Sequence, residues 1–259
     1  TIYTDEPAAG AAQEDKMPQV RPKVVLLDYT PDPEQVIALA AKLCYSDADI
    51  DTLKKGVESK DVSKFLQRLM SMGHHSPIEH ASFTFGIEGV SRALLAQITR
   101  HRIASFSVKS QRYVSAGGAE TFNYVIPPAI EALGEEYADK FRAQMDEIQK
   151  WYNEWQTLLG GACEKSNEDA RFVLPNASET KMIVTMNARE LIHFFRLRCC
   201  NRAQWEIREV AWQMLALVSE VAPMLFAGAG PACVSGPCSE DKMSCGRPEE
   251  VRARRKELK

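Results

Sequence analysis

The chain has 259 residues, 45% of them hydrophobic and 26% charged, so it can bury a substantial core and has the composition of an ordinary globular protein. A net charge of −3 argues against a general nucleic-acid-coating protein, which carries a basic excess over its binding face. No apolar run approaches the length of a membrane span. We therefore expect a soluble, cytoplasmic protein with neither nucleic acid nor membrane as a partner.

The two ends of the chain differ from its middle. Residues 1–22 are polar and lack the apolar core that a secretory signal needs, so we predict a disordered N-terminal lead-in. Residues 23–229 are predicted to form a single domain. Residues 230–259 form a charged tail that contains Cys, Gly and Pro.

Seven cysteines, an odd number, without a recognisable export signal indicate free thiols and not a disulfide framework. Three of them, Cys233, Cys238 and Cys245, fall in a Gly/Pro-rich segment, residues 228–246. A metal ion or a redox-formed disulfide could cross-link this segment. Their spacing lacks a close C-x2-C pair and a fourth ligand. We therefore predict no metal site, and the purpose of these cysteines stays open.

Apolar periodicity predicts the elements of the first half of the chain. In order, these are a buried strand at 23–29, a helix from Pro33 to about Cys44, a helix from about Asp61 to Met72, a strand at 82–88 with one buried face, and a helix with Val90, Leu94 and Ile98 on one side. The region directly after Ile98 is then presented from the end of a helix.

The second half reads as mainly helical. A long helix is predicted from Pro127 and Pro128 to about Leu159, interrupted at most at Gly134, with an aromatic stripe suited to a core or a subunit interface. A short helix ends at 171–175, a strand follows at 181–186, and the longest helix runs from about Ala188 to Val221. The predicted fold class is α+β, with a small sheet packed against several long helices.

Residues 100–112 hold four cations, one histidine and three serine hydroxyls within thirteen residues. The planar guanidinium fork of arginine matches two phosphate oxygens, and serine hydroxyls or turn N–H groups can satisfy the remaining lone pairs. This composition indicates a phosphate-binding segment. Ser110 has no nearby histidine or aspartate in the sequence to act as its base, so we assign it to binding and not to nucleophilic attack.

The spacing R-H-R-x2-S-x4-S-x-R, from Arg100 to Arg112, resembles the signature of the flavin-dependent thymidylate synthases. The resemblance covers roughly residues 23–229. It implies conversion of dUMP to dTMP, with FAD as cofactor, methylenetetrahydrofolate as carbon donor and NADPH as reductant. It also implies a homotetramer whose flavin sites lie between subunits, and the chain indeed lacks the G-x-G-x-x-G fingerprint of a Rossmann site.

The resemblance assigns most of the signature to ligands. The residues implied for dUMP are Gln97, Arg100, Val108, Lys109, Ser110, Gln111, Arg112, Arg171 and Arg198, and those implied for FAD in this region are Arg100, His101, Arg102 and Ile103. Val108 departs from the family, which carries Glu or Gln there, so any contact must come from its backbone. Arg202 is a second departure, because some relatives have a histidine at that position.

Two further segments match the family. In Gly73–His80, the pattern G-H-x-[ST]-P-x-E-H implies that Ser76 binds FAD and that His74 lies near flavin and folate. After the strand at 181–186, Asn187, Arg189 and His193 are implied on the FAD. Arg198 is implied on the uracil ring, where a permanent cation at O4/N3 would stabilise the charge that develops when hydride arrives. We therefore assign Arg198 as the catalytic residue and expect Cys199 and Cys200 to be packed thiols.

Two other classes stay open. A nucleotide-binding or RNA-binding module could use the basic segment without redox chemistry, with affinity that falls steeply with salt. A metal-dependent hydrolase could use the histidines of residues 74–80 with Glu79. Pro77 disrupts the helix that a zincin motif needs, which weakens that reading.

Overall fold

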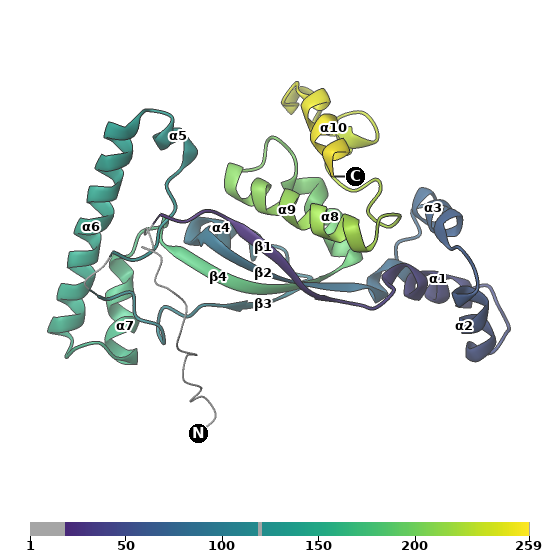
Figure 1. The fold of residues 1–259 in the computed structure, drawn as a ribbon, viewed down its shortest axis with the longest axis horizontal. Helices are drawn as coiled ribbons and strands as arrows, with labels where there is room; N and C mark the ends of the chain where they lie inside the picture. Colours follow the sequence, from purple (N-terminus) through teal and green to yellow (C-terminus); the bar gives the residue numbers. More distant parts are fainter. Residues whose placement is uncertain (1–18, 119–120, 259) are drawn as a thin grey trace, which may run out of the picture.

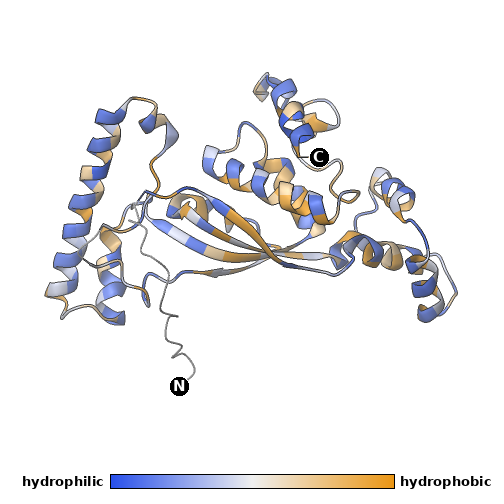
Figure 2. Ribbon diagram, viewed as in Figure 1, coloured by the Kyte–Doolittle hydropathy of each residue, from blue (hydrophilic) through white to orange (hydrophobic). Residues whose placement is uncertain are grey.

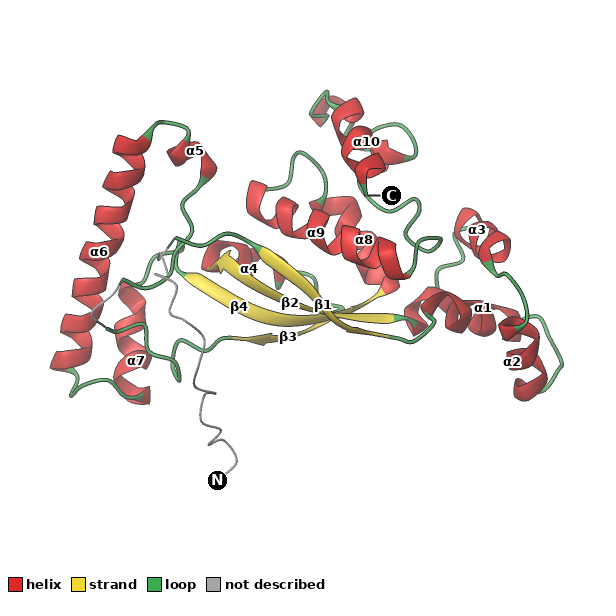
Figure 3. Cartoon of the chain, in the orientation of Figure 1, coloured by secondary structure: helices red, strands yellow, loops and turns green. Residues whose placement is uncertain are grey.

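The computed structural model of the protein describes residues 19–118 and 121–258, and its centre is a four-stranded sheet (Figures 1 and 3). The strands are β1 (Lys23–Tyr29), β2 (Ser82–Ser91), β3 (Ala104–Val108) and β4 (Glu179–Asn187), in the order β1-β2-β4-β3, with every neighbouring pair antiparallel. The short β3 therefore forms one edge. The predicted α+β class is confirmed.

Three helices lie on one face of the sheet: α4 (Arg92–Ile98), α8 (Ala188–Arg198) and α9 (Trp205–Val221) (Figure 1). Strand residues alternate, so Phe83, Phe85 and Val184 point into this layer and are fully buried. Figure 2 shows apolar residues gathered along α8 and α9, whereas α6 is largely hydrophilic. The main core therefore lies between the sheet and these helices.

The remaining elements extend the molecule at the two ends of the sheet and beside α8 and α9 (Figure 1). One end holds α1 (Pro33–Leu43), α2 (Ile50–Glu58), α3 (Ser63–Ser71) and the 3-10 turn η1 (Pro77–His80). The other holds α5 (Pro128–Glu131), α6 (Glu135–Leu158), α7 (Glu164–Ala170) and the turn η2 (Arg171–Val173). The tail adds turns η3 (Ala232–Val234) and η4 (Asp241–Met243) and helix α10 (Pro248–Glu257).

The opposite face of the sheet carries no helix from the described parts of the chain (Figure 1). Its apolar side chains Val25, Leu27 and Ile183 are 42%, 52% and 47% exposed. They line a cavity of about 560 Å³ together with neighbouring residues of β2, β3 and β4. The strand predicted at 23–29 is confirmed with those bounds, but it is not buried as predicted, because β1 is an edge strand covered on one side only.

Several predicted boundaries were also wrong. The helix predicted from Ala188 to Val221 is two helices, because Gln204 begins a new one: its side chain accepts hydrogen bonds from the N–H groups of Glu206 and Ile207, at 3.0 and 3.1 Å. Strand β2 continues to Ser91, so the helix predicted around Val90 begins at Arg92. By contrast, the interruption allowed at Gly134 in the helical region up to about Leu159 is confirmed: α6 begins directly after Gly134, whose φ is 116°.

Both terminal segments contain residues that contact the rest of the fold. The predicted disordered segment falls largely on residues 1–18, outside the described residues, while Gln19 forms a β-bridge with Tyr124. In the tail, the buried Arg255 donates hydrogen bonds to the carbonyl oxygens of Phe226 and Ala229, at 2.7 and 3.1 Å. Helix α10 is thereby fixed to the segment that follows α9. Among the described helices, none combines the length and apolar character that crossing a membrane requires.

Candidate functional site

Strand β3 divides the arginine-rich segment into two halves. The segment leaves α4 at Ile98, enters β3 with Ala104 opposite Met186, and leaves it where the N–H of Lys109 donates to the carbonyl of Lys181, at 2.9 Å. At about 3.3 Å per residue, Ile103 and Lys109 lie roughly 20 Å apart. Within one chain, residues before β3 and residues after it therefore lie at two separate cavities.

The first place is a cavity of about 560 Å³ where β4 meets α8. Four residues predicted for FAD line it, namely Ile103, Asn187, Arg189 and His193, and His75, Glu79 and Arg196 lie on the same wall. Asn187 caps α8: its side-chain oxygen accepts from the N–H of Glu190, at 2.9 Å. The positive N-terminus of α8, Arg189 and Arg196 make this cavity suitable for an organic anion.

Three charged or polar side chains form a chain of contacts beside this cavity. His101 Nδ1 lies 2.9 Å from Glu190 Oε1, and Arg198 Nε donates to His101 Nε2 at 3.1 Å. His101 is 6% exposed and Glu190 is 7% exposed. Because an arginine Nε–H can only donate, Nε2 of the imidazole must hold its lone pair, and Nδ1 must carry the proton given to Glu190.

The pKa values agree with a neutral imidazole. Burial is the main effect that lowers the pKa of His101; the charges of Arg198 and His193 act in the same direction, and Glu190 opposes them. Burial, together with the nearby positive charge of Arg100, also lowers the pKa of Arg198, which stays a cation. Arg198 is thus a fixed positive charge oriented by a neutral histidine, with Arg100 close to it.

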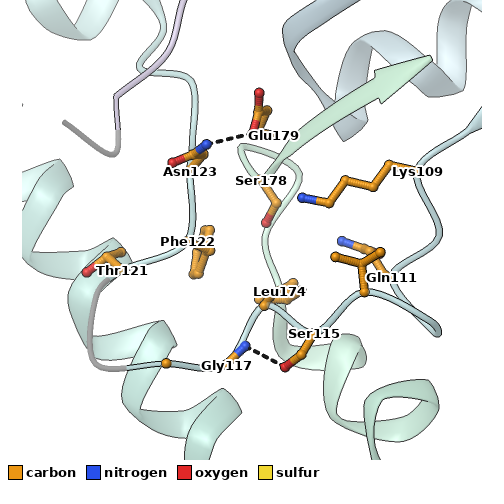
Figure 4. A pocket seen from close by; sticks show the side chains of 13 residues that line it. Lys109, Gln111, Ser115, Gly117, Thr121, Phe122, Asn123, Leu174, Ser178 and Glu179 are labelled. Carbon is orange, nitrogen blue, oxygen red and sulfur yellow. Dashed lines mark hydrogen bonds between the residues drawn. The ribbon is translucent and has the colours of Figure 1, made fainter. Parts of the chain in front are cut away.

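The second place is a cavity of about 490 Å³ beyond the other end of β3 (Figure 4). Lys109 and Gln111, both predicted for dUMP, line it, together with Ser115 and Gly117. Ser178 also lines it, and its buried hydroxyl has no hydrogen-bond partner among the residues that the structure describes. Sequence reasoning missed Ser178, because nothing but its position between two pairing segments marks it.

Three other predicted dUMP residues lie next to this cavity without lining it. Arg112 forms ion pairs with Glu164 and Glu168, at 2.8 and 2.7 Å, and Arg171 Nε donates to the carbonyl of Glu168 at 3.1 Å. Ser110 Oγ accepts hydrogen bonds from the N–H groups of the two residues that follow Gln111, which shapes the turn. Its hydroxyl proton is left to donate to a ligand.

Five further predicted residues, in addition to those already described, also line neither cavity. Val108 lies in β3 opposite Met182, and its side chain packs against the main core. Gln97 donates to the carbonyl of Ala93 within α4, at 3.5 Å, and Arg102 is exposed. Ser76 begins η1, whose Glu79 does reach the first cavity, and His74 packs edge-on against Tyr45, with ring centroids 6.2 Å apart. Arg202 pairs with Glu240 of the tail, at 2.5 Å.

The histidine-rich segment does not form a metal site in this fold. Glu79, its one carboxylate, is ion-paired with Arg189, and only His75 and Glu79 of the segment reach the first cavity. Across the described part of the chain, no three His, Cys, Asp or Glu side chains stand close enough together to hold a metal ion as they are. The geometry therefore does not favour the hydrolase reading.

Comparison with known proteins gives a consistent result. Residues 25–224 match the model of a family described as "Thymidylate synthase complementing protein". A Geobacter sulfurreducens protein named flavin-dependent thymidylate synthase is 54% identical over 230 residues, which are 89% of this chain and 96% of its own. Proteins of the same name from Clostridium tetani and Pyrococcus abyssi are 51% and 44% identical, covering 89% and 85% of this chain and 95% and 91% of their own.

Proposed function

The chain belongs to the flavin-dependent thymidylate synthase family and is an enzyme, and from this premise we propose that it methylates dUMP to dTMP with bound FAD. Methylenetetrahydrofolate is the proposed carbon donor. Its one-carbon unit needs two further electrons to become a methyl group, and NADPH is proposed to supply them. The observation that carries the proposal is that three distant segments, around His75, Ile103 and Arg189, line one cavity.

The first cavity fits a flavin nucleotide. Its volume of about 560 Å³ is typical of cofactor sites, and its wall joins the apolar side chains Ile103 and Ile192 to the cations Arg189 and Arg196. The N–H groups at the start of α8 and the guanidinium of Arg189 would hold phosphate oxygens, and His193 would contact the polar groups of the cofactor. When bound, the flavin supplies the redox chemistry of the reaction.

Arg198 is proposed to act on the pyrimidine. A guanidinium held by His101 would donate to O4 of the uracil ring and stabilise the negative charge that develops across O4 and N3. Because His101 accepts at Nε2, it fixes the orientation of the guanidinium without neutralising its charge. Arg100, whose charge already acts on Arg198, would bring a second cation to the same substrate.

The second cavity fits a phosphate. Lys109 supplies a cation, Gln111 and Ser115 supply neutral donors, and the unpaired hydroxyl of Ser178 is a further donor on the wall. Ser110 and Arg112 lie in the adjoining turn. These groups would hold the 5′-phosphate of dUMP.

The two cavities cannot share one nucleotide within one chain, because roughly 20 Å of strand separates Ile103 from Lys109. We therefore propose that the site is completed by a second copy, with the first cavity of one protomer facing the second cavity of its partner. The uncovered apolar face of the sheet, with Val25, Leu27 and Ile183 exposed, supports such an assembly. The proposed state is the homotetramer implied by the signature.

The absorption spectrum of the purified protein, supplied with FAD and titrated with dUMP, tests this function. A bound oxidised-flavin spectrum that shifts with added dUMP is the expected result, since both ligands share one site. A colourless protein that retains no FAD, ignores dUMP and binds single-stranded RNA in a salt-dependent way would replace the enzyme by the nucleic-acid module.

A further inference from the structure

Four of the seven cysteines line one small cavity where the tail meets the end of α8. The four-thiol cluster consists of Cys200 from the turn after α8, Cys233 from η3, Cys238 from the segment between η3 and η4, and Cys245 from the segment between η4 and α10. Four separate backbone segments thus bring one thiol each to the same place. All four cysteines are free.

The fourth thiol is what the sequence spacing did not reveal. Cys233, Cys238 and Cys245 lie close together in the sequence, whereas Cys200 precedes them by more than thirty residues and reaches them only because α9 turns the chain back. The fold therefore supplies the fourth sulfur ligand that the sequence spacing lacks.

The size and chemistry of the cavity restrict its occupant. Its volume is about 20 Å³, enough for one small ion and too small for an organic cofactor or a polynuclear cluster. Glu240 also lines it but is ion-paired with Arg202, so the available ligands are sulfur atoms. Arg196 on the wall, and Arg252, which donates to the carbonyl of Cys233 at 2.8 Å, place positive charge around the thiols.

We propose that the four-thiol cluster binds a single zinc ion that fastens the tail to the turn after α8. Four thiolates are a frequent ligand set for structural zinc, which soft sulfur donors select. As the side chains stand, no three potential ligands within the described ranges converge closely enough to hold an ion. The thiols must therefore rotate inward when zinc enters, and three of them are only half-buried in segments without regular structure.

The ion would act on a part of the fold that contains little regular secondary structure before α10. Between Gly230 and α10 the tail contains only the turns η3 and η4. It is held by the buried side chains of Cys233 and Val251 and by side-chain hydrogen bonds that Arg252 and Arg255 donate to backbone carbonyls. The turn held by Cys200 begins directly after Arg198. Zinc at this position would hold the turn after α8 and the tail together.

Metal analysis of the full-length protein tests the proposal, without any use of catalytic activity. We expect about one zinc per chain after desalting. Cys238→Ser and Cys245→Ser should each lose most of it, while the exposed Cys44→Ser and Cys163→Ser should retain it. Iron in place of zinc, or zinc that all four variants retain equally, would overturn the proposal.

A second measurement on the unmodified protein does not depend on whether the variants fold. A mercurial reagent added to the native protein should release zinc, detected with a chromogenic chelator, and Co²⁺ exchanged into the site should show sulfur-to-cobalt charge-transfer absorption. A protein without stoichiometric zinc that also fails to take up Co²⁺, with its cluster cysteines reactive as free thiols or joined as disulfides, would contradict the proposal.

Discussion

Glu190, His101 and Arg198 form the most constrained set of single residues in the site. The unfolded chain protonates a histidine near pH 6.5, whereas burial, aided by Arg198 and His193 and opposed by Glu190, lowers the pKa of His101 in the fold. The stability that the neutral imidazole contributes is therefore fully present above about pH 6.5 and is lost as the pH falls toward the lower folded pKa. Below that pKa, His101 can no longer accept from Arg198.

We predict that His101→Gln flattens this acid limb. An amide can donate to Glu190 and accept from Arg198, but it does not titrate. Between about pH 5 and pH 7, the free energy of unfolding and kcat should fall less steeply in the variant than in the unchanged protein. The exposed His80→Gln is the control, and an acid limb that is equally steep in all three proteins would contradict the assignment.

Arg198 should be required for chemistry and not for holding the flavin. Arg198→Ala should retain FAD and lose dTMP formation by about a hundredfold or more, as for other electrostatic stabilisers of a transition state. Arg198→Lys keeps the charge but loses the planar fork, so it should recover only part of the rate. Single-turnover rates and flavin content measure the two effects separately, and normal turnover by the alanine variant would refute the role.

At the residue scale, the sequence could predict which residues lie near a ligand, but not that they are divided between two cavities. Ile103, Asn187, Arg189 and His193 share one cavity as expected, and Lys109 and Gln111 share another. The separation follows from β3, which lies inside the segment predicted to bind phosphate. Glu190 was not assigned a role, because a glutamate in the first turn of a helix is ordinary and only its burial against His101 distinguishes it.

At the scale of elements, Gly89 fixes the bend of β2. It lies at the register shift between Ile87 and Val90 with a φ of 68°, and a Cβ there would stand 2.0 Å from the carbonyl oxygen of Arg21. Gly73 has a similar φ of 70°, but nothing lies within 4 Å of its Cβ position. An alanine at Gly73 would therefore meet backbone strain alone, whereas an alanine at Gly89 would meet backbone strain and a steric clash.

We predict that Gly89→Ala costs about 2–5 kcal/mol of the free energy of unfolding, the sum of a left-handed backbone and an overpacked contact. Gly73→Ala should cost only the backbone part, about 1–2 kcal/mol. Urea unfolding of both variants provides the comparison. Equal losses of unfolding free energy in the two variants would contradict the prediction, because they would mean that the backbone of Arg21 shifts without cost.

Sequence patterns predicted the elements that alternate or repeat clearly and failed where a side chain sets a boundary. Strands β2 and β4 were found because Phe83, Phe85 and the residues facing them alternate cleanly. The break between α8 and α9 was missed because it contains neither Gly nor Pro and depends on the Gln204 cap. Ala104, Phe106 and Val108 do alternate with exposed serines, so β3 had a signal that the arginines obscured.

At the scale of the whole molecule, the uncovered sheet face should mediate self-association. Leu27 lies on this face and is 52% exposed, and a charge there would be buried without a partner in an assembly. Leu27→Glu should weaken association at least tenfold, seen as lower-mass species in sedimentation velocity. Ile50→Glu, at an equally exposed position in α2, should leave the mass unchanged, and an unaltered Leu27→Glu assembly would place the interface elsewhere.

The central claim is that each active site joins the Arg198 side of one protomer to the Arg112 side of its partner. Co-expression of Arg198→Ala chains with Arg112→Ala chains, each inactive alone, tests it most directly. If the halves come from different protomers, mixed assemblies contain some sites with both arginines intact, and we predict that dTMP formation returns. If mixed assemblies form and stay as inactive as the separate variants, the two residues act within one chain, and the proposed shared site is wrong.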